Sequence, residues 1–484
     1  MGCAIAPLCA PALGCKKPDP GADLQILDAS ARLRSDEPLP RSSPYFDGTR
    51  VALALARGEV LGLEVWHRDG APVTLTIDGA RVEAFATVAY RVVRPSTALY
   101  GGSRGAGRYP DGLVAAAAPT SDPAYLAITA EGTPGDHAGT LTIGARAIPV
   151  TLAIAPVVLP PPPIAAWAYY DAHELGGVDE APSDRERACI AMFRARGVLL
   201  SPDLPVAAWP ARRALLAGSP LVPAVVADDP ARIGDDVRAW IAATDGTGQL
   251  PFAIPIDEPH DARARERVRA LGEAAHAAGA GPSRFLFAVT DDPRPEYAGA
   301  VDLLITLHAR LADDGTRWTY NGAPPRAGAM VLDAEPPGMR TWGWIAYRYK
   351  IPLWYVWDAL YWHDRHHHKT AALDPARDAV SFDDGDDRGN LDGVLALPGD
   401  AATPCLPTLR LEALRRGLED RQLLELAARC GRAATDAIAE RMVPRALGDA
   451  TAEPAWPSDP AAWEAARREL LAIATRCAAT APLP

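Results

Sequence analysis

Pro160-Pro161-Pro162-Pro163-Ile164-Ala165-Ala166-Trp167-Ala168-Tyr169-Tyr170 is the stretch at which the pattern of the chain changes. Four consecutive prolines favour an extended polyproline segment, which is typical of a stiff linker between domains. The apolar run 164–170 that follows has the length and composition of a buried strand. We therefore predict a linker at 160–163 and a new domain that begins at residue 164.

Before the linker, the pattern has period two. Short apolar runs such as 51–55, 73–77 and 140–143 are separated by turns rich in glycine, aspartate and proline, and no helical segment lies between them. Many short strands with such turns are typical of a β-sandwich. We predict one over residues 22–159.

After the linker, apolar strands alternate with helical stretches, as in a parallel sheet wrapped by crossover helices. The helical stretches 229–244 and 261–280 are the clearest, because apolar residues recur there every three to four positions. Eight strand-helix units predict a (β/α)8 TIM barrel over 164–404, with its active site at the carboxyl ends of the strands. The candidate strands are 164–170, 197–200, 221–227, 251–256, 285–290, 301–307, either 317–321 or 330–332, and 352–357.

The segment 405–484 is predicted to be a helical extension on the outside of the barrel. Leu411, Leu414 and Leu418 mark one apolar face, and we expect the polar side chains of this segment to face water. The polar side chains in question are Arg415, Arg416, Glu419 and Asp420.

The segment 1–21 resembles a bacterial lipoprotein signal. An apolar stretch ends in Ala12-Leu13-Gly14-Cys15, and a polar, proline-containing tether follows. This resemblance implies lipidation at Cys15, a lipid anchor and an exported protein in the periplasm or on the cell surface of a bacterium. The alternative is a disordered tail. Four later cysteines lack metal-ligand spacing, and we expect them to be small buried apolar residues: Cys189, Cys405, Cys430 and Cys477.

The charge of the chain argues against nucleic acid as a partner. The 484 residues include 49 Lys and Arg against 61 Asp and Glu, which gives a net charge of −12. Binding to phosphates needs a clustered excess of basic side chains. The sequence also lacks the ~18 consecutive apolar residues of a spanning helix, which excludes a polytopic membrane protein.

The pair Asp257-Glu258, followed by Pro259, stands where the fourth predicted strand ends. Barrel enzymes place their acids at this position. Neighbours on a regular strand point to opposite faces, but a turn before the proline lets both side chains reach the mouth. Two adjacent carboxylates repel each other, so one of them should keep its proton to higher pH. The alternative is structural, with Asp257 as a helix cap and Glu258 as a first-turn charge.

Several blocks of the chain resemble glycoside hydrolase family 123 and its uncharacterised relatives. The Asp257-Glu258-Pro259 step resembles the catalytic pair of that family. Segments 56–60 and 138–152 look like its sandwich domain, 318–321 and 340–362 like its aromatic-rich barrel end, and 393–399 with 407–420 like its closing block.

This resemblance implies a retaining N-acetyl-β-galactosaminidase, a class that hydrolyses terminal N-acetyl-β-hexosaminides with the substrate's own acetamido oxygen as nucleophile. Glu258 would then be the general acid/base, and Asp257 would orient the acetamido group. The expected partner is an oligosaccharide or glycoconjugate, and the oligomeric state stays open. One rival is a glycosidase of other specificity that uses Asp291 or Asp333 as a second carboxylate. The other rival is a non-catalytic carbohydrate-binding surface lipoprotein.

Half of the twelve tryptophans lie between Trp318 and Trp362, near the last predicted strands. Sugar rings present apolar C–H faces, so an aromatic floor with polar neighbours suits a sugar site. Core packing and surface ion pairing are the alternatives. We predict these substrate-binding residues at the mouth: Tyr170, Asp171, Asp291, Tyr320, Asn321, Arg340, Trp344 and Trp357.

No metal or cofactor is predicted. The cluster His363, His366, His367 and His368 lacks an acidic or thiol partner at zinc-ligand spacing and is typical of a solvated loop. The acidic stretch 383–390 lacks the glutamate that closes an EF-hand. The sequence shows no phosphate-binding glycine-rich motif.

Overall fold

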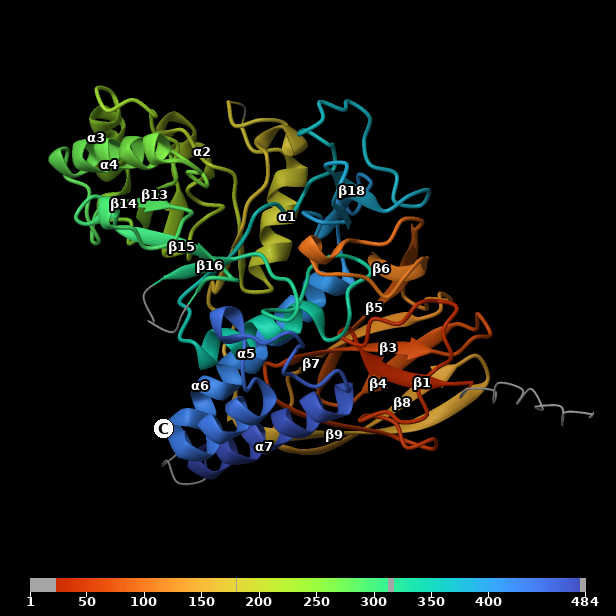
Figure 1. Cartoon of the computed structure of the whole chain (residues 1–484). Coiled ribbons are helices and arrows are strands. Elements are labelled where there is room, and N and C mark those ends of the chain that lie inside the picture. Colours follow the sequence, from red (N-terminus) through yellow and green to blue (C-terminus); the bar gives the residue numbers. More distant parts are fainter. Residues whose placement is uncertain (1–22, 180, 312–316, 479–484) are drawn as a thin grey trace, which may run out of the picture.

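The computed structural model describes residues 23–179, 181–311 and 317–478 (Figure 1). The lipidation site predicted at Cys15 lies outside these residues. No described helix has the length and apolar character needed to cross a membrane. The predicted domain boundaries remain predictions.

Two sheets form the N-terminal part of the described chain. A five-stranded sheet has the order β1-β3-β7-β5-β6, and a four-stranded sheet has the order β2-β9-β8-β4. The strands are β1 (Gln25–Asp28), β2 (Val51–Arg57), β3 (Val60–Trp66), β4 (Val73–Ile77), β5 (Ala80–Val92), β6 (Gly107–Ala115), β7 (Ala124–Ala130), β8 (Gly135–Ile143) and β9 (Arg146–Val158).

The two sheets share one apolar core. Leu53 and Leu152 from one sheet and Leu63 and Leu126 from the other belong to the same buried cluster. Buried and exposed residues alternate along β9, as expected for a strand with one face on this core. The pairings are antiparallel except for β2 with β9. This arrangement fits the predicted β-sandwich.

An eight-stranded parallel sheet follows, with the order β11-β10-β17-β16-β15-β14-β13-β12. Its ends meet at one parallel bridge, in which the Leu204 N–H donates to the Pro223 carbonyl at 3.2 Å and the Val225 N–H donates to the Leu204 carbonyl at 2.8 Å. The sheet therefore curls into a TIM-like barrel. Its strands are β10 (Ala166–Ala168), β11 (Val198–Leu200), β12 (Leu221–Pro223), β13 (Leu250–Ala253), β14 (Leu286–Val289), β15 (Leu303–Leu307), β16 (Trp318–Tyr320) and β17 (Trp354–Val356).

Each candidate strand overlaps one of these strands, β13 beginning one residue before its candidate, and the seventh is the 317–321 alternative. The helices are less regular than predicted. They are α1 (Asp184–Arg194), the short α2 (Trp209–Arg212), α3 (Ile233–Thr244), α4 (Ala262–Ala277) and α5 (Thr341–Arg348). Only a 3-10 turn, η4 (Pro295–Tyr297), follows β14, and the described residues between β15 and β16 contain no helix. The expectation of a helix after every strand is wrong there, because the β14–β15 connection is short and carries two prolines.

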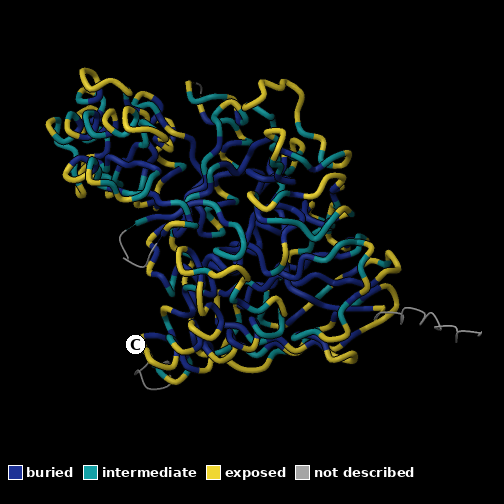
Figure 2. Tube along the Cα trace, viewed as in Figure 1, coloured by how far each residue is buried: buried dark blue, intermediate teal, exposed yellow. Residues whose placement is uncertain are grey.

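The C-terminal helices are α6 (Leu409–Met442) and α7 (Pro460–Ala478), and α6 contacts α5, α7 and strands β3 and β6 (Figure 1). The prediction that its polar face meets water is wrong. Arg415, Arg416, Glu419 and Asp420 are all buried. In Figure 2, buried segments lie in the centre of the molecule, between exposed loops at its edges. The face packs on the sandwich, where Arg416 Nη1 lies 2.6 Å from Glu59 Oε1. Ion pairs between oppositely charged side chains of the helix and the sandwich offset the free-energy cost of burying these charges.

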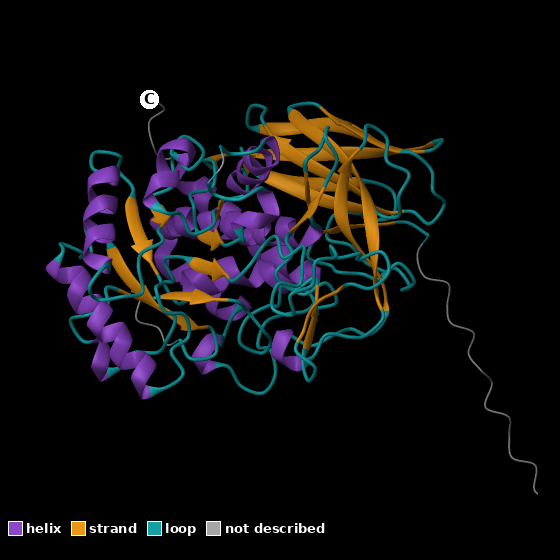
Figure 3. Ribbon diagram, turned by 90° about the horizontal axis from the view of Figure 1, so that it is seen from above, coloured by secondary structure: helices purple, strands orange, loops and turns teal. Residues whose placement is uncertain are grey.

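Two small hairpins precede α6, formed by β18 (Val380–Asp383) with β19 (Arg388–Asn390) and by β20 (Ala396–Pro398) with β21 (Cys405–Pro407). Seen from above, the sandwich strands lie to one side of the helices and strands of the barrel (Figure 3).

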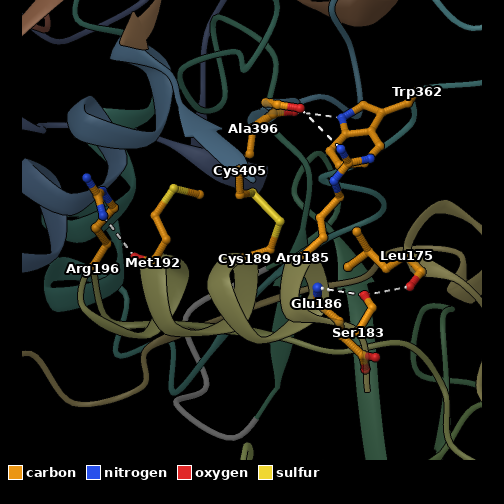
Figure 4. Close-up of a disulfide and its surroundings, with 11 residues drawn as sticks. Leu175, Ser183, Arg185, Glu186, Cys189, Met192, Arg196, Trp362, Ala396 and Cys405 are labelled. Carbon is orange, nitrogen blue, oxygen red and sulfur yellow. Dashed lines mark hydrogen bonds between the residues drawn. A yellow bond between two sulfur atoms is a disulfide. The ribbon is translucent and has the colours of Figure 1, made fainter. Parts of the chain in front are cut away.

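Four cysteines form two disulfides, which corrects the prediction of free buried thiols. Cys189 on α1 is bonded to Cys405 on β21, with Cα atoms 5.3 Å apart (Figure 4). Cys430 on α6 is bonded to Cys477 on α7. The partners are 216 and 47 residues apart in the sequence, so spacing gave no sign of the pairing.

Removal of the first disulfide should destabilise the protein measurably. The Cys189–Cys405 bond closes a loop of 216 residues, which strongly restricts the unfolded chain. We expect the double variant Cys189→Ala, Cys405→Ala to lose about 2–5 kcal/mol of unfolding free energy. Denaturant unfolding followed by tryptophan fluorescence measures it. The Cys430→Ala, Cys477→Ala pair, which opens the shorter loop, should lose less, and an equal or larger loss there would contradict this account.

Candidate active site

Asp257 and Glu258 follow β13 at the carboxyl end of the barrel, and both reach solvent. Glu258 has a φ of 42°, a left-handed conformation that few residues other than glycine adopt. Its N–H donates to Thr290 Oγ1 at 2.7 Å, and the Thr290 hydroxyl donates to Asp257 Oδ1. The Tyr320 hydroxyl donates to Glu258 Oε1 at 2.6 Å. The turn thus brings both carboxyl groups to side chains at the ends of β14 and β16.

The structural alternative for this pair is wrong. The N-cap of α4 is Asp261, whose Oδ1 accepts from the Ala264 N–H at 2.7 Å. Asp257 and Glu258 precede that cap and make no cap hydrogen bond. Strained backbone at residues of this kind is typical of functional sites.

The pKa of Asp257 is raised above the ordinary aspartate value. Loss of hydration is the largest cause, and the adjacent Glu258 charge adds to it, whereas the hydrogen bond from Thr290 acts in the opposite direction. Burial and the bond to Glu258 also raise the pKa of the Tyr320 hydroxyl. Asp257 therefore keeps its proton to a higher pH than an ordinary aspartate does.

Aromatic rings fill the barrel beneath the acids. Trp167 stacks on Tyr355 with ring centroids 4.4 Å apart, and Phe252 meets Trp167 edge-on at 4.8 Å. Tyr320 lies 6.2 Å from Tyr355. Side chains alternate along a strand, so residues two positions from Trp167 or Tyr355 also face the barrel interior.

This alternation corrects one predicted residue. Tyr170 is buried outside the barrel interior, where its hydroxyl donates to Glu186 Oε1 on α1 at 3.1 Å. Tyr169 shares the face of Trp167. Burial raises the pKa of its hydroxyl, and the charges of Asp203, Asp171 and Asp358 add to the shift. Tyr169 stands two positions after Trp167, so alternation along this strand could have identified it from the sequence.

Two further carboxyl groups follow barrel strands and are not among the predicted site residues. Asp203 is exposed, whereas Asp358 is fully buried. Asp203 follows β11, and loss of hydration together with the Asp257 charge raises its pKa to about 7. Asp358 follows β17, and burial raises its pKa to about 7 although Arg365 opposes the shift. Asp358 comes directly after a predicted strand and Asp203 three residues after one, which is the signal that could have found them.

Arg365 forms ion pairs with three carboxylates at the rim of the barrel. Its guanidinium lies 3.2 Å from Asp171 Oδ2 and 2.7 Å from Glu174 Oε1, and it also pairs with Asp358. Asp171, predicted to bind substrate, is therefore at the rim, where it also caps the 3-10 turn η2 (Ala172–Leu175). The Asp171 carboxylate therefore already has two partners, Arg365 and the backbone of η2.

Asp291, Asn321 and Trp357 also lie at this end of the barrel. Asp291 Oδ2 accepts from the Tyr297 hydroxyl at 2.6 Å. Asn321 has a φ of 52°, and its Oδ1 accepts from the Trp357 N–H at 3.3 Å. Trp357 is half-buried, and its indole N–H donates to Asp392 Oδ2 at 3.1 Å.

Arg340 and Trp344 do not belong to the mouth, and their prediction as substrate-binding residues is wrong. Both are fully buried. Arg340 pairs with Asp28 at 3.0 Å and with Asp420 at 2.8 Å, and the Trp344 indole N–H donates to Asp420 at 2.9 Å. Their segment faces α6 and the sandwich instead of the barrel opening.

Asp333, one of the two carboxylates considered for a conventional double displacement, is also fully buried. It accepts from the Ser96 N–H at 2.9 Å and from Asn390 Nδ2 at 3.2 Å. This residue joins the sandwich to the barrel and is closed to a substrate.

A cavity of about 300 Å³ opens beside Glu258. Its lining residues are Glu258, Pro259, His260, Arg265, Thr290, Asp291, Asp292, Arg294, Leu307, Arg310 and Tyr320. A larger cavity, of about 610 Å³, lies at the opposite end of β13 between α3 and α4. Barrel chemistry takes place at the carboxyl ends of the strands, so the smaller cavity is the relevant one.

The described residues contain no group of three or more His, Cys, Asp or Glu side chains placed to hold a metal ion. Within the histidine cluster, His363 Nδ1 lies 2.8 Å from Glu174 and His367 Nδ1 lies 2.9 Å from Asp364. His366 packs edge-on against Phe382.

In a comparison with solved structures, the chain shares the fold of a glycoside hydrolase. It is similar to a family 123 glycoside hydrolase from Clostridium perfringens, with 9% sequence identity and a TM-score of 0.61 over 94% of this chain and 98% of that chain. At this identity, the likeness shows the fold alone.

Two other structures overlap far less. A family 2 glycosyl hydrolase from Bacteroides cellulosilyticus has 12% identity and a TM-score of 0.26, over 63% of this chain and 44% of that chain. A proposed alpha-galactosidase from Bacteroides fragilis has 9% identity and a TM-score of 0.24, over 63% and 73%. No family model matches the sequence, and no curated protein matches it.

Proposed function

We propose that this protein is a retaining glycoside hydrolase of the family 123 type that removes terminal N-acetyl-β-hexosamine, in particular N-acetyl-β-galactosamine, by substrate-assisted catalysis. One observation carries the proposal. Asp257 and Glu258 stand side by side at the barrel mouth, linked through Thr290, above a floor of aromatic rings. The fold shared with the Clostridium perfringens enzyme supports it.

In the first step, Glu258 donates its proton to the glycosidic oxygen while the C1–O bond breaks. The acetamido carbonyl oxygen of the sugar forms a bond to C1, which yields an oxazolinium ring and releases the aglycone as an alcohol. The Glu258 carboxylate then takes a proton from a water molecule whose oxygen attacks C1. This attack reopens the ring, and the product keeps the β configuration.

Asp257 acts on the acetamido group in this scheme. Its carboxylate accepts a hydrogen bond from the acetamido N–H and stabilises the positive charge that develops on the ring. The raised pKa of Asp257 means that the free enzyme holds a proton there more readily than an ordinary aspartate does. The hydrogen bond from the substrate favours the anion, so binding promotes release of that proton.

The Tyr320 hydroxyl supports the role of Glu258. At 2.6 Å from Oε1, it holds the carboxyl group in one orientation. The Tyr355 ring beneath offers an apolar face to the sugar. Adjacent acids suffice for this chemistry, since the substrate replaces the second carboxylate that ordinary retaining enzymes keep about 5 Å away.

The pH dependence of activity should follow the ionisation of Asp257. Because its pKa is raised, the acid limb of kcat/KM should lie above the ordinary aspartate value of 3.8. The bond from Thr290 lowers that pKa, so Thr290→Val should move the limb to higher pH. Steady-state rates across a pH series measure it. Thr247→Val, at the opposite end of the barrel, is the control, and a Thr290→Val limb that stays in place or moves to lower pH contradicts the assignment.

A screen of aryl glycosides tests the proposed function. We expect turnover of the N-acetyl-β-galactosaminide and tight binding of a thiazoline that mimics the cyclic intermediate. Asp203, a further carboxyl group near Asp257, favours one alternative, a glycosidase that works without acetamido participation. It predicts turnover of a substrate with a 2-hydroxyl group and no thiazoline inhibition. A non-catalytic binding protein predicts no turnover at all.

We further propose that the protein is exported and anchored by a lipid at Cys15. The two disulfides support this, because such bonds persist in oxidising compartments and are rare in the cytosol. Metabolic labelling with a fatty acid tests it: label on the wild type that is lost in Cys15→Ala supports the anchor, and an unlabelled wild type contradicts it.

A further inference from the structure

The cavity beside Glu258 lies on one side of the acid pair. Glu258, Thr290 and Tyr320 line it, whereas Asp257 and Tyr355 are not among its lining residues. In the proposed function, on which this inference rests, Asp257 faces the acetamido group and Glu258 faces the leaving oxygen. The cavity is therefore on the side of the aglycone.

Three arginines line this cavity: Arg265, Arg294 and Arg310. Besides Glu258, the lining carboxylates are Asp291 and Asp292. When Glu258 carries the proton that it donates, the described lining holds three guanidinium groups and two carboxylates. The lining thus carries more positive than negative charge, although the net charge of the chain is −12.

The two aspartates orient the arginines and are already engaged. Asp291 accepts from the Tyr297 hydroxyl at 2.6 Å, from the Asp292 N–H at 2.7 Å and from Arg294 at 3.3 Å. Asp292 lies 3.1 Å from Arg310 and 3.7 Å from Arg294. They therefore hold the Arg294 and Arg310 guanidinium groups at the cavity, whereas Arg265 Nε lies 3.8 Å from Glu296 Oε1.

The arginines keep donors available. The Arg265 and Arg294 side chains are 21% and 37% exposed, and both line the cavity. The Arg310 side chain is 58% exposed. Guanidinium groups match the geometry of carboxylate and sulfate oxygens, and charge-assisted bonds of this type are the stronger ones.

We propose that this cavity binds an anionic aglycone, a sugar that carries a carboxylate or a sulfate group next to the bond that is cleaved. The protein would then prefer N-acetyl-β-galactosamine linked to an acidic sugar over the same sugar on a neutral one. The preference is electrostatic, so added salt should weaken it.

Three disaccharides test this proposal. In each, N-acetyl-β-galactosamine is linked to O4 of a methyl glycoside of glucose, of glucuronic acid or of glucose 6-sulfate. We expect kcat/KM to be about tenfold higher for an acidic acceptor at low ionic strength and the advantage to shrink in about 0.5 M NaCl. The more favoured acid shows whether the carboxylate or the sulfate is the natural group, and either result supports the proposal.

Charge-neutralising variants locate the effect. Arg310→Gln and Arg265→Gln should each reduce the ratio of acidic to neutral kcat/KM several-fold. The matched control is Arg238→Gln, because Arg238 is as exposed as Arg310, at 59%, and lines the cavity at the opposite end of the barrel. This control should leave the ratio unchanged.

The outcomes separate the two proposals. If the neutral substrate is hydrolysed and the acidic ones have no advantage, or an advantage that ignores salt and both arginine variants, the anionic subsite is overturned and the proposed function stands. If no disaccharide and no aryl glycoside is hydrolysed, the proposed function fails and this inference fails with it.

Discussion

The variant Glu258→Gln should lose hydrolysis of an aryl N-acetyl-β-galactosaminide by at least about a thousandfold, the upper range of general acid catalysis. Gln keeps the size of the side chain and can still accept from the Tyr320 hydroxyl, which lies 2.6 Å from Glu258 Oε1. What it removes is the proton that the leaving oxygen needs. Release of the aryl alcohol, followed by absorbance, measures the loss.

Glu273→Gln provides the matched control. Glu273 lies on α4, is 59% exposed and pairs with Arg269 at 3.3 Å. This variant should retain full activity. Near wild-type rates in Glu258→Gln, with an unchanged thermal unfolding midpoint, would remove Glu258 from the mechanism.

The second large effect is expected for Asp257→Asn, at about a hundred- to thousandfold in kcat. Asn keeps the shape but lacks the charge that stabilises the oxazolinium ring. The loss should therefore fall on the chemical step, and the affinity for a thiazoline inhibitor should fall in parallel, since that compound resembles the cyclic intermediate.

Asp228→Asn is the control for this variant. Asp228 is 65% exposed and pairs with Arg267 at 2.8 Å. A result in which Asp257→Asn raises KM but leaves kcat and thiazoline affinity intact would contradict the assigned role, because it would show that Asp257 binds the substrate without acting in the transition state.

The strands of the barrel could be predicted because each is a short apolar run followed by a polar turn. The acids were found for the same reason, since Asp257 and Glu258 come directly after such a run. The period-two pattern likewise revealed the sandwich. Local patterns of this kind record which face of a strand or helix is apolar and must be covered.

The errors concern contacts between segments far apart. Tyr170 was chosen where the Trp167 register points to Tyr169, an error of one position that reverses the face. Arg340 and Trp344 meet Asp420 on α6, about 80 residues away, and no local pattern announces that contact. Thr290, which links the two acids, is an ordinary strand residue until the fold brings β14 next to β13.

The central claim is participation of the acetamido group, and one series of substrates tests it most directly. Aryl β-galactosaminides with acetyl, difluoroacetyl and trifluoroacetyl groups on the nitrogen differ mainly in the nucleophilicity of the carbonyl oxygen. The account predicts that kcat/KM falls with each fluorine, by about two orders of magnitude or more over the series. Rates that are equal across the series would contradict it.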